Sequence, residues 1–425
     1  MSNLSTRELF DQYVIPTYGR FELKLARGRG CEVWDEDGKR YLDFGAGIAV
    51  TSVGHCHPRV VAKMQEQIAS LVHVSNLYFT RPQGELAERL VRLTGPGKAF
   101  FCNSGAEANE ALYKLARKFG NETAGGPRIG IVTMRGSFHG RTLGGISATG
   151  QDKVKKGFEP MVQGFAVAPT EDGYVPYNDC DALRAAVAQP GVVAVMFEPV
   201  QGESGIHPAT PEFLRLARQL CDERGLLLFF DEVQCGLGRT GDWCGWKTIA
   251  PDVMPDAVSW AKGIAGGFPL GAIWASDREL TLADGTKKKL CDLLGPGTHG
   301  TTFGGTPLVC IGANEVLAVV EEEGMLENAR TTGAYALEVL RAIKHPLIRE
   351  VRGIGLMLGI ELVPDFADLA KPPAGRAPSL WMVDRLHEAG LLVIPSGTHA
   401  LRWLPPLNVT RAQIDEAAAI FAATL

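Results

Sequence analysis

Four short apolar runs, separated by stretches in which apolar residues have helical spacing, constrain the fold of this chain more than any other feature. The runs lie at 99–101, 129–132, 192–197 and 226–230. A strand that is apolar at consecutive positions is buried on both faces, which is typical of a parallel sheet between layers of helices. The 425 residues are enough for a large core and for two domains. The sequence therefore predicts an α/β fold with a mostly parallel sheet.

The two ends of the chain follow a different pattern. Residues 29–43 predict a β-hairpin, and residues 57–72 predict an amphipathic helix. A long helix is expected at 310–323, and strands are expected near 350–362 and 400–404. We therefore expect a second, smaller α+β domain in the C-terminal part of the chain.

Composition argues against several classes of protein. The net charge of 43 − 48 = −5 favours neither a nucleic-acid nor a membrane partner, and no apolar run reaches the roughly 18 residues of a membrane span. The first ten residues do not resemble a signal peptide. Nine cysteines, an odd number with no CxxC pair, indicate a reducing compartment. We expect a cytoplasmic protein.

Lys262 follows the fifth apolar stretch, 256–261, and opens a glycine-rich loop. Glycines leave room for a large group close to the backbone. An amine in such a place can form a Schiff base with an aldehyde cofactor. A solvated surface lysine is the alternative, and the loop alone favours it.

Ligands of an open α/β sheet bind at the carboxyl ends of its strands, so the residues after each run are the candidates for a site. Gly105 and Ala106 open a helix whose free N–H groups suit a phosphate; an ordinary N-cap at Ser104 is the alternative. Asp231 follows the run 226–230, where a carboxylate needs a partner. It can hold a protonated ring nitrogen, or it can serve in a helix cap or salt bridge.

Two further loops carry candidate ligand contacts. Phe138 and Arg141 follow the second run, where they can stack on a ring and bind a carboxylate; a packed ring and a surface arginine are the alternative. Thr301 and Thr302 stand among glycines and offer a second phosphate contact, although a plain turn is the simpler interpretation.

Two other motifs are interpreted as structural. Residues 236–241 match the dinucleotide pattern GxGxxG, but the preceding strand ends at Phe230 and no helical pattern follows. His55-Cys56-His57 has no third ligand at a suitable spacing, so no metal site is predicted.

The candidates at the strand ends fit one cofactor, pyridoxal phosphate. A lysine can hold it, an acid can keep its ring nitrogen protonated, and a helix terminus can bind its phosphate. Once displaced, the lysine amine can carry a proton between carbon atoms.

The sequence resembles the class III (fold type I) pyridoxal-phosphate aminotransferases, and among them the acetylornithine aminotransferases. The resemblance runs almost end to end, over blocks at 18–20, 46–50, 54–58, 73–78, 103–110, 138–142, 198–203, 231–234 and 299–305. It implies a large cofactor-binding domain at 76–310 with a seven-stranded type of sheet. The segment 1–75 would join the small domain and a dimer interface, and 311–425 would form the small domain.

The resemblance also implies a role for each cofactor residue. It assigns Lys262 to the Schiff base, Asp231 to the pyridine nitrogen, Gln234 to the ring hydroxyl, Val233 and Phe138 to the two ring faces, Gly105 and Ala106 to the phosphate, and Thr302 to the phosphate of the neighbouring subunit.

The substrate residues follow from the same resemblance. Arg141, with Thr301 nearby, would bind a substrate carboxylate. Glu203 and Arg402 resemble a gating pair, in which Arg402 is masked for an ω-amino donor and freed for the α-carboxylate of glutamate. Tyr18 would also contact substrate.

The implied reaction is a ping-pong transfer of the ω-amino group of N2-acetylornithine to 2-oxoglutarate through pyridoxamine phosphate. It gives N-acetylglutamate 5-semialdehyde and glutamate, as in arginine biosynthesis, in a homodimer with shared active sites. Ornithine, 4-aminobutyrate or succinyl-diaminopimelate as the donor is one alternative. A non-catalytic, cofactor-binding regulatory protein is another.

The chain departs from the family pattern at two places. The stretch 278–294 is longer than usual, which we expect to alter the dimer edge, and Lys287-Lys288-Lys289 within it is interpreted as a solvated loop. Thr306 stands where an asparagine is common, which removes an amide contact there.

Overall fold

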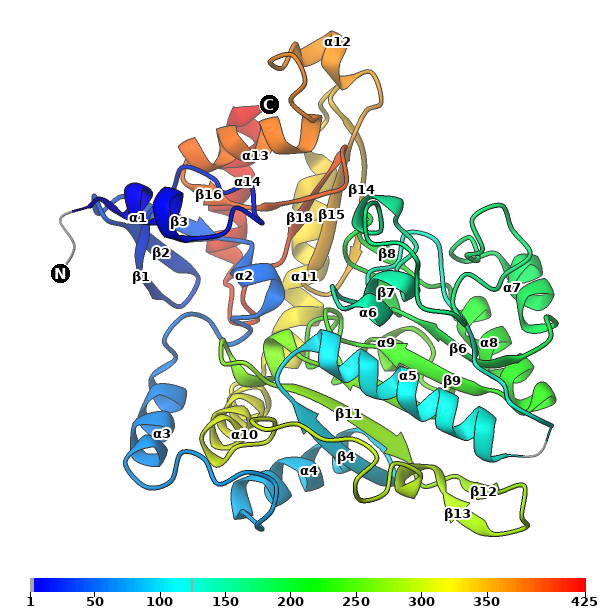
Figure 1. Cartoon of the computed structure of the whole chain (residues 1–425). Coiled ribbons are helices and arrows are strands. Elements are labelled where there is room, and N and C mark those ends of the chain that lie inside the picture. The colour runs from blue at the N-terminus through cyan, green and yellow to red at the C-terminus, as the bar shows by residue number, and fades with distance from the viewer. Residues whose placement is uncertain (1–3, 124) are drawn as a thin grey trace.

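The computed structural model describes residues 4–123 and 125–425, and its centre is a six-stranded sheet with helices on both faces (Figure 1). In spatial order the strands are β4 (Gly97–Cys102), β11 (Gly271–Ser276), β10 (Ala257–Trp260), β9 (Leu227–Asp231), β6 (Val192–Phe197) and β5 (Gly130–Val132). β10, β9, β6 and β5 are parallel, whereas β11 is antiparallel to both neighbours. The predicted α/β class and mostly parallel sheet are therefore confirmed.

The sheet has six strands rather than the seven expected. In the described part of the chain, the segment beyond β5 makes only isolated bridges, Met134–Val175 and Arg135–Gly150. Turn-forming residues interrupt this segment: Gly164 and Gly173 have positive φ angles of 95° and 79°. Such residues break a continuous ladder of hydrogen bonds, so no seventh strand forms here.

Helices cover both faces of this sheet. α5 (Gly105–Glu122) crosses one face and packs on β6, β10 and β11. α4 (Arg81–Thr94) contacts β4 and β11, and α8 (Pro211–Arg224) contacts β6 and β9. Shorter elements complete this part: α6 (Leu143–Ala148), α7 (Cys180–Val187), α9 (Gly245–Ile249), η1 (Asp152–Val154), β7 (Val200–Gln201) and β8 (His207–Pro208).

The N-terminal and C-terminal parts of the chain share a second core. Leu42, Phe44 and Val60 belong to one buried apolar cluster with Trp403 and Phe421. The N-terminal strands β1 (Leu25–Arg29), β2 (Glu32–Asp35) and β3 (Arg40–Asp43) continue into β16 (Leu391–Leu392). The expected hairpin is confirmed, whereas domain boundaries at 75 and 310 stay a prediction.

A four-stranded antiparallel sheet lies beside that core, with the order β14 (Ile348–Ile354), β15 (Met357–Leu362), β18 (Ala400–Trp403) and β17 (Ile394–Ser396). The strands expected near 350–362 and 400–404 are thus present. The remaining helices are α1 (Thr6–Tyr13), α2 (Ala46–Ala49), α3 (Pro58–Ile68), α10 (Pro307–Glu322), α11 (Met325–Ala342), α12 (Phe366–Ala370), α13 (Pro378–Glu388) and α14 (Arg411–Thr424). α10 begins three residues before the predicted start because proline suits the first helical turn.

The interpretation of Lys287–Lys289 as a solvated loop was wrong. These residues form β13, which pairs with β12 (Glu279–Thr281) in an antiparallel hairpin. The turn between them is closed by Asp284, whose carboxylate accepts the Thr286 N–H at 2.9 Å. The short helix η3 (Leu290–Asp292) follows. A charged run on an exposed hairpin cannot be told from a loop by its sequence, because the side chains are solvated in a loop and on an exposed strand alike.

Candidate functional site

A cavity of about 450 Å³ opens at the carboxyl ends of β4, β6, β9 and β10. Nine of the residues predicted for the site line it: Gly105, Ala106, Phe138, Arg141, Glu203, Asp231, Val233, Gln234 and Lys262. These residues are far apart in sequence, and the parallel strands bring them to one edge of the sheet.

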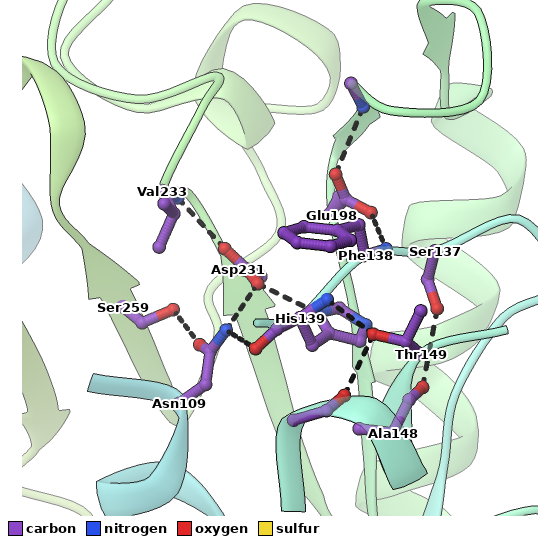
Figure 2. Close-up of polar contacts among 12 residues, drawn as sticks. Asn109, Ser137, Phe138, His139, Ala148, Thr149, Glu198, Asp231, Val233 and Ser259 are labelled. Carbon is purple, nitrogen blue, oxygen red and sulfur yellow. Dashed lines mark hydrogen bonds and ion pairs between the residues drawn. The ribbon is translucent and has the colours of Figure 1, made fainter. Parts of the chain in front are cut away.

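Asp231, the last residue of β9, is the hub of the polar contacts in this cavity (Figure 2). Its Oδ1 accepts the Val233 N–H at 3.0 Å. Its Oδ2 accepts hydrogen bonds from Asn109 Nδ2 at 2.7 Å and contacts His139 Nδ1 at 2.8 Å. A carboxylate has about four acceptor positions, so this pattern leaves one for a further donor.

Asn109 and His139 are themselves held in place. Asn109 accepts the Ser259 hydroxyl at 2.7 Å and donates to the His139 carbonyl at 3.0 Å. The His139 N–H donates to the Thr149 hydroxyl at 2.9 Å (Figure 2). Burial by itself disfavours the imidazolium, but the hydrogen bond and charge of Asp231, together with the charge of Glu198, outweigh it and raise the pKa of His139. The raised pKa favours the imidazolium form of His139 next to Asp231.

Glu198 closes the cavity next to this network. It follows β6 and accepts the N–H groups of Phe138 at 3.0 Å and Gly202 at 3.1 Å (Figure 2). Burial raises the pKa of its carboxyl. The contact with Phe138 orients the loop that carries the ring predicted to stack on the cofactor.

Lys262 opens the 3₁₀ turn η2 (Lys262–Ala265), one residue after the end of β10. Its φ of 43° lies in a region that side-chain-bearing residues rarely adopt, and such strain is concentrated at functional sites. Within the described residues its Nζ has no hydrogen-bond or ion-pair partner. Burial lowers the pKa of this amine, against the opposing charge of Glu203. A lysine with a lowered pKa is more often the neutral, nucleophilic amine.

Glu203 and Arg402 form a bidentate ion pair at the cavity. The two distances are 2.7 Å from Nη1 to Oε1 and 3.2 Å from Nη2 to Oε2. Arg402 is buried in β18 and also donates to the Gln234 side chain at 3.3 Å. Burial would raise the pKa of Glu203, but the charges of Arg402 and Lys262 outweigh it and lower that pKa. The positive charge of Arg402 is thus balanced by the carboxylate of Glu203.

The N-terminus of α5 faces the cavity through Gly105 and Ala106. Ser104 is the N-cap, and its hydroxyl accepts the Glu107 N–H at 3.2 Å. Neither Gly105 nor Ala106 makes a backbone N–H bond within the described residues, so both can donate to an anion. A side chain at 105 would come within 2.8 Å of Val233, which explains the glycine. The N-cap at Ser104 is thus confirmed, and the phosphate contact of Gly105 and Ala106 stays a prediction.

Four predicted residues do not line the cavity. Thr301 contacts the cavity residue Asn103, because its hydroxyl accepts a hydrogen bond from the Asn103 side-chain amide at 3.0 Å. Thr302 is exposed. Arg402 reaches the cavity through Glu203. Tyr18 is 72% exposed and lines a separate hollow beside α1, so this chain alone does not bring it to the site.

Sequence reasoning assigned no role to Asn109, His139 or Glu198, which the structure places around Asp231. All three lie inside blocks quoted for the resemblance, at 103–110, 138–142 and 198–203. Position in the chain alone could not show that Asn109, on the second turn of α5, faces the sheet.

The two motifs interpreted as structural have protein partners. His55 contacts Asp43 at 2.7 Å and His57 contacts Glu323 at 3.3 Å. Arg239, within the GxGxxG match, is buried and donates to the Leu356 carbonyl at 3.2 Å. Within residues 4–123 and 125–425, no three His, Cys, Asp or Glu side chains are placed to hold a metal ion, and no helix is long and apolar enough to cross a membrane.

Glu232, next to Asp231, predicts a pH dependence of stability. Its carboxylate is buried and accepts the N–H groups of Gly245 and Trp246 at 2.7 and 3.0 Å. Burial raises its pKa from 4.5 to about 7. Between these values the folded state binds more protons than the unfolded chain, so the free energy of unfolding falls as pH rises.

We expect Glu232→Gln to remove this contribution to the pH slope. Urea unfolding of wild type and variant at several pH values across the range from 4.5 to about 7 measures it. The wild type should lose stability relative to the variant as pH rises. Parallel profiles would show that Glu232 does not titrate in this range.

Comparison with known proteins shows what this chain is similar to. A family model described as aminotransferase class-III matches residues 13–425. The acetylornithine aminotransferase of Thermosynechococcus vestitus is 45% identical over 418 residues, covering 96% of this chain and 94% of the relative. That of Bacillus subtilis is 42% identical over 402 residues, covering 94% of each.

Solved structures give the same result. The N-acetylornithine aminotransferase of Stenotrophomonas maltophilia superposes with a TM-score of 0.78 at 33% identity, covering 98% of this chain and 97% of the other. The ornithine aminotransferase of Toxoplasma gondii superposes with a TM-score of 0.87 at 31% identity, covering 98% and 92%. The similarity therefore extends over nearly the whole chain.

Proposed function

Because this chain belongs to the class-III aminotransferases, we propose that it transfers the ω-amino group of N2-acetylornithine to 2-oxoglutarate. An amino donor and a keto acid are the substrates of such an enzyme. The observation that favours an ω-amino donor is the ion pair between Arg402 and Glu203. With Arg402 paired, Arg141 is left to bind the one carboxylate of such a donor. The acetylornithine aminotransferase relatives support N2-acetylornithine among the ω-amino donors.

Pyridoxal phosphate is the cofactor, and the Toxoplasma gondii neighbour holds it at its active site. When bound, its ring accepts electron density from the substrate carbon that loses a proton. The residues of this chain fit it: Lys262 offers an unpaired amine, Asp231 an unused acceptor position, and Gly105 and Ala106 two free N–H groups. Gln234, Val233 and Phe138 complete the proposed contacts.

Each protein group then has a task that its chemistry allows. We assign to Lys262 the covalent attachment of the cofactor and the removal of the proton from the substrate carbon that carries the amino group, since its amine has a lowered pKa. Asp231, backed by Asn109 and His139, stabilises positive charge on the cofactor ring nitrogen. Arg141, whose guanidinium lies 5.4 Å from the Phe138 ring centroid, orients the substrate carboxylate.

A donor profile tests the proposed function. We expect kcat/KM for N2-acetylornithine to exceed that for ornithine, 4-aminobutyrate and succinyl-diaminopimelate by about tenfold or more, which corresponds to about 1.4 kcal/mol of transition-state binding. Each donor is assayed with 2-oxoglutarate. A preference for unacylated ornithine would overturn the choice of donor but leave the reaction class intact.

We also propose that the active unit is a homodimer. Leu77, Tyr78 and Phe79 are exposed beside Phe303, and Asn76 ties their segment to the 301–304 loop by donating to the Gly304 carbonyl at 2.9 Å. Soluble monomers rarely leave such contiguous apolar surface uncovered. Thr302 stands in the same exposed loop, which supports its predicted contact with the phosphate in the neighbouring subunit.

Phe79→Arg should weaken this dimer. Placing a charge in an apolar interface costs about 2 kcal/mol or more, so the dimer dissociation constant should rise by about 30-fold. Sedimentation equilibrium measures it, and the activity per chain should fall in parallel. Phe158→Arg, at another exposed phenylalanine, is the control. A wild type that is monomeric and active would overturn the homodimer.

A further inference from the structure

Arg352 of β14 reaches from the four-stranded sheet to the loop that carries Glu203. Its Nε donates to the carbonyls of Gly205 at 2.9 Å and Ile206 at 3.0 Å. Its side chain is only 11% exposed. Because one guanidinium donates to both carbonyls, it holds the backbone in place two and three residues after Glu203.

The guanidinium is itself held by acids on the sheet. Arg352 Nη1 contacts Glu350 at 2.8 Å and makes a short ion pair with Glu361. The Nη2 group lies 3.4 Å from the His207 ring, whose Nε2 is 3.0 Å from the Ser204 carbonyl. Arg352 therefore links the sheet to both ends of the segment 204–207.

That segment is strained and tightly enclosed. Gly205 and Ile206 have positive φ angles of 120° and 61°, and Ile206 is β-branched, for which this conformation is costly. A side chain at Gly359 of β15 would come within 2.6 Å of the Gly205 carbonyl, so the strand and the loop touch. Gly359 pairs with Arg402 across the β15–β18 ladder. The segment 204–207 and Arg402 thus both lie against β15 at Gly359.

We infer that Arg352 is a positioning residue that sets how firmly Glu203 masks Arg402, and thereby the preference of the enzyme between ω-amino donors and substrates, such as glutamate, that react at an α-amino group and carry a second carboxylate. The inference rests on the proposed function of the Glu203–Arg402 pair. A strained loop needs an external contact to stay in place, and the two carbonyl bonds of Arg352 supply it. Without them Glu203 spends less time on Arg402, which is then free for a second carboxylate.

The test compares two first half-reactions of the holoenzyme, one with N2-acetylornithine and one with glutamate, each followed by cofactor absorbance in single turnovers. In Arg352→Met and Arg352→Lys, the ratio of kcat/KM for glutamate to that for N2-acetylornithine should rise about five- to tenfold. Arg349→Met is the matched control. Arg349 pairs with the same Glu361 at 3.1 Å but is 59% exposed, and it touches neither carbonyl.

A double-mutant cycle with Glu203→Gln separates positioning from general damage. Arg352→Met should add no further change to the ratio in that background, because the masking carboxylate is already gone. A ratio that stays constant in both Arg352 variants, or that shifts equally in Arg349→Met, overturns the inference. A wild type that reacts with neither amine overturns instead the proposed function, so the two failures are distinguishable.

Discussion

Lys262→Ala is expected to lower kcat by about 10⁴-fold or more, because one change removes both the covalent attachment and the group that moves the proton. Few other side chains in the cavity can substitute. Asp231 is an acceptor held by three protein hydrogen-bond donors, and the guanidinium of Arg141 has donors but no acceptor. The measurement is single-turnover conversion of N2-acetylornithine, with cofactor occupancy determined separately, so that loss of binding is not mistaken for loss of chemistry.

Lys155→Ala is the matched control for that experiment. Burial lowers the pKa of Lys155 as it does that of Lys262, but its amine lies over the Tyr174 ring, 4.0 Å from the centroid, and does not line the cavity. Its turnover should stay within about twofold of wild type, as is usual for a residue outside the site. Unchanged turnover in Lys262→Ala would exclude the aminotransferase mechanism itself.

The strand ends could be predicted from sequence because one rule governs them. Consecutive apolar residues at 192–197 and 226–230 indicate strands buried on both faces, and parallel strands gather their carboxyl ends at one edge. Asp231 is the last residue of one such strand, and Lys262 follows another after a single residue. The topology of the sheet alone brings both residues to one cavity. Local sequence patterns were therefore sufficient to predict that they lie close together.

Contacts that depend on the rotation of a helix or on an exposed edge could not be predicted in this way. Asn109 reaches Asp231 only because α5 packs with that face on the sheet, and Arg352 meets Gly205 only because two sheets lie side by side. The β13 strand was missed since its lysines carry no apolar alternation. Tyr18 and Thr302 do not line the cavity of this chain, so their roles stay predictions.

Asp231→Asn tests the charge at the hub of the site without changing its shape. An asparagine retains one acceptor oxygen, but it cannot offer a negative charge to the ring nitrogen of the cofactor. We expect kcat to fall by about 10²–10³-fold, the loss typical when one preorganised electrostatic partner of a reacting group is removed. The negative charge of Asp231, which helps to raise the pKa of His139, is lost as well, so that pKa should fall towards or below its ordinary value. Histidine titration by NMR measures this second effect.

Asp256→Asn separates the loss of a catalytic charge from the loss of any buried carboxylate. Asp256 precedes β10, is equally buried, and pairs with Arg218 and Arg278 at 2.9 Å, away from the cavity. Leaving two arginines short of their partner should lower the melting temperature while kcat per folded enzyme stays within about twofold. Asp231→Asn should show the reverse, a small change in melting temperature and a large change in kcat. Equal losses of kcat in both variants would mean that Asp231 acts through the stability of the fold, and the assignment of its charge to the cofactor ring would fail.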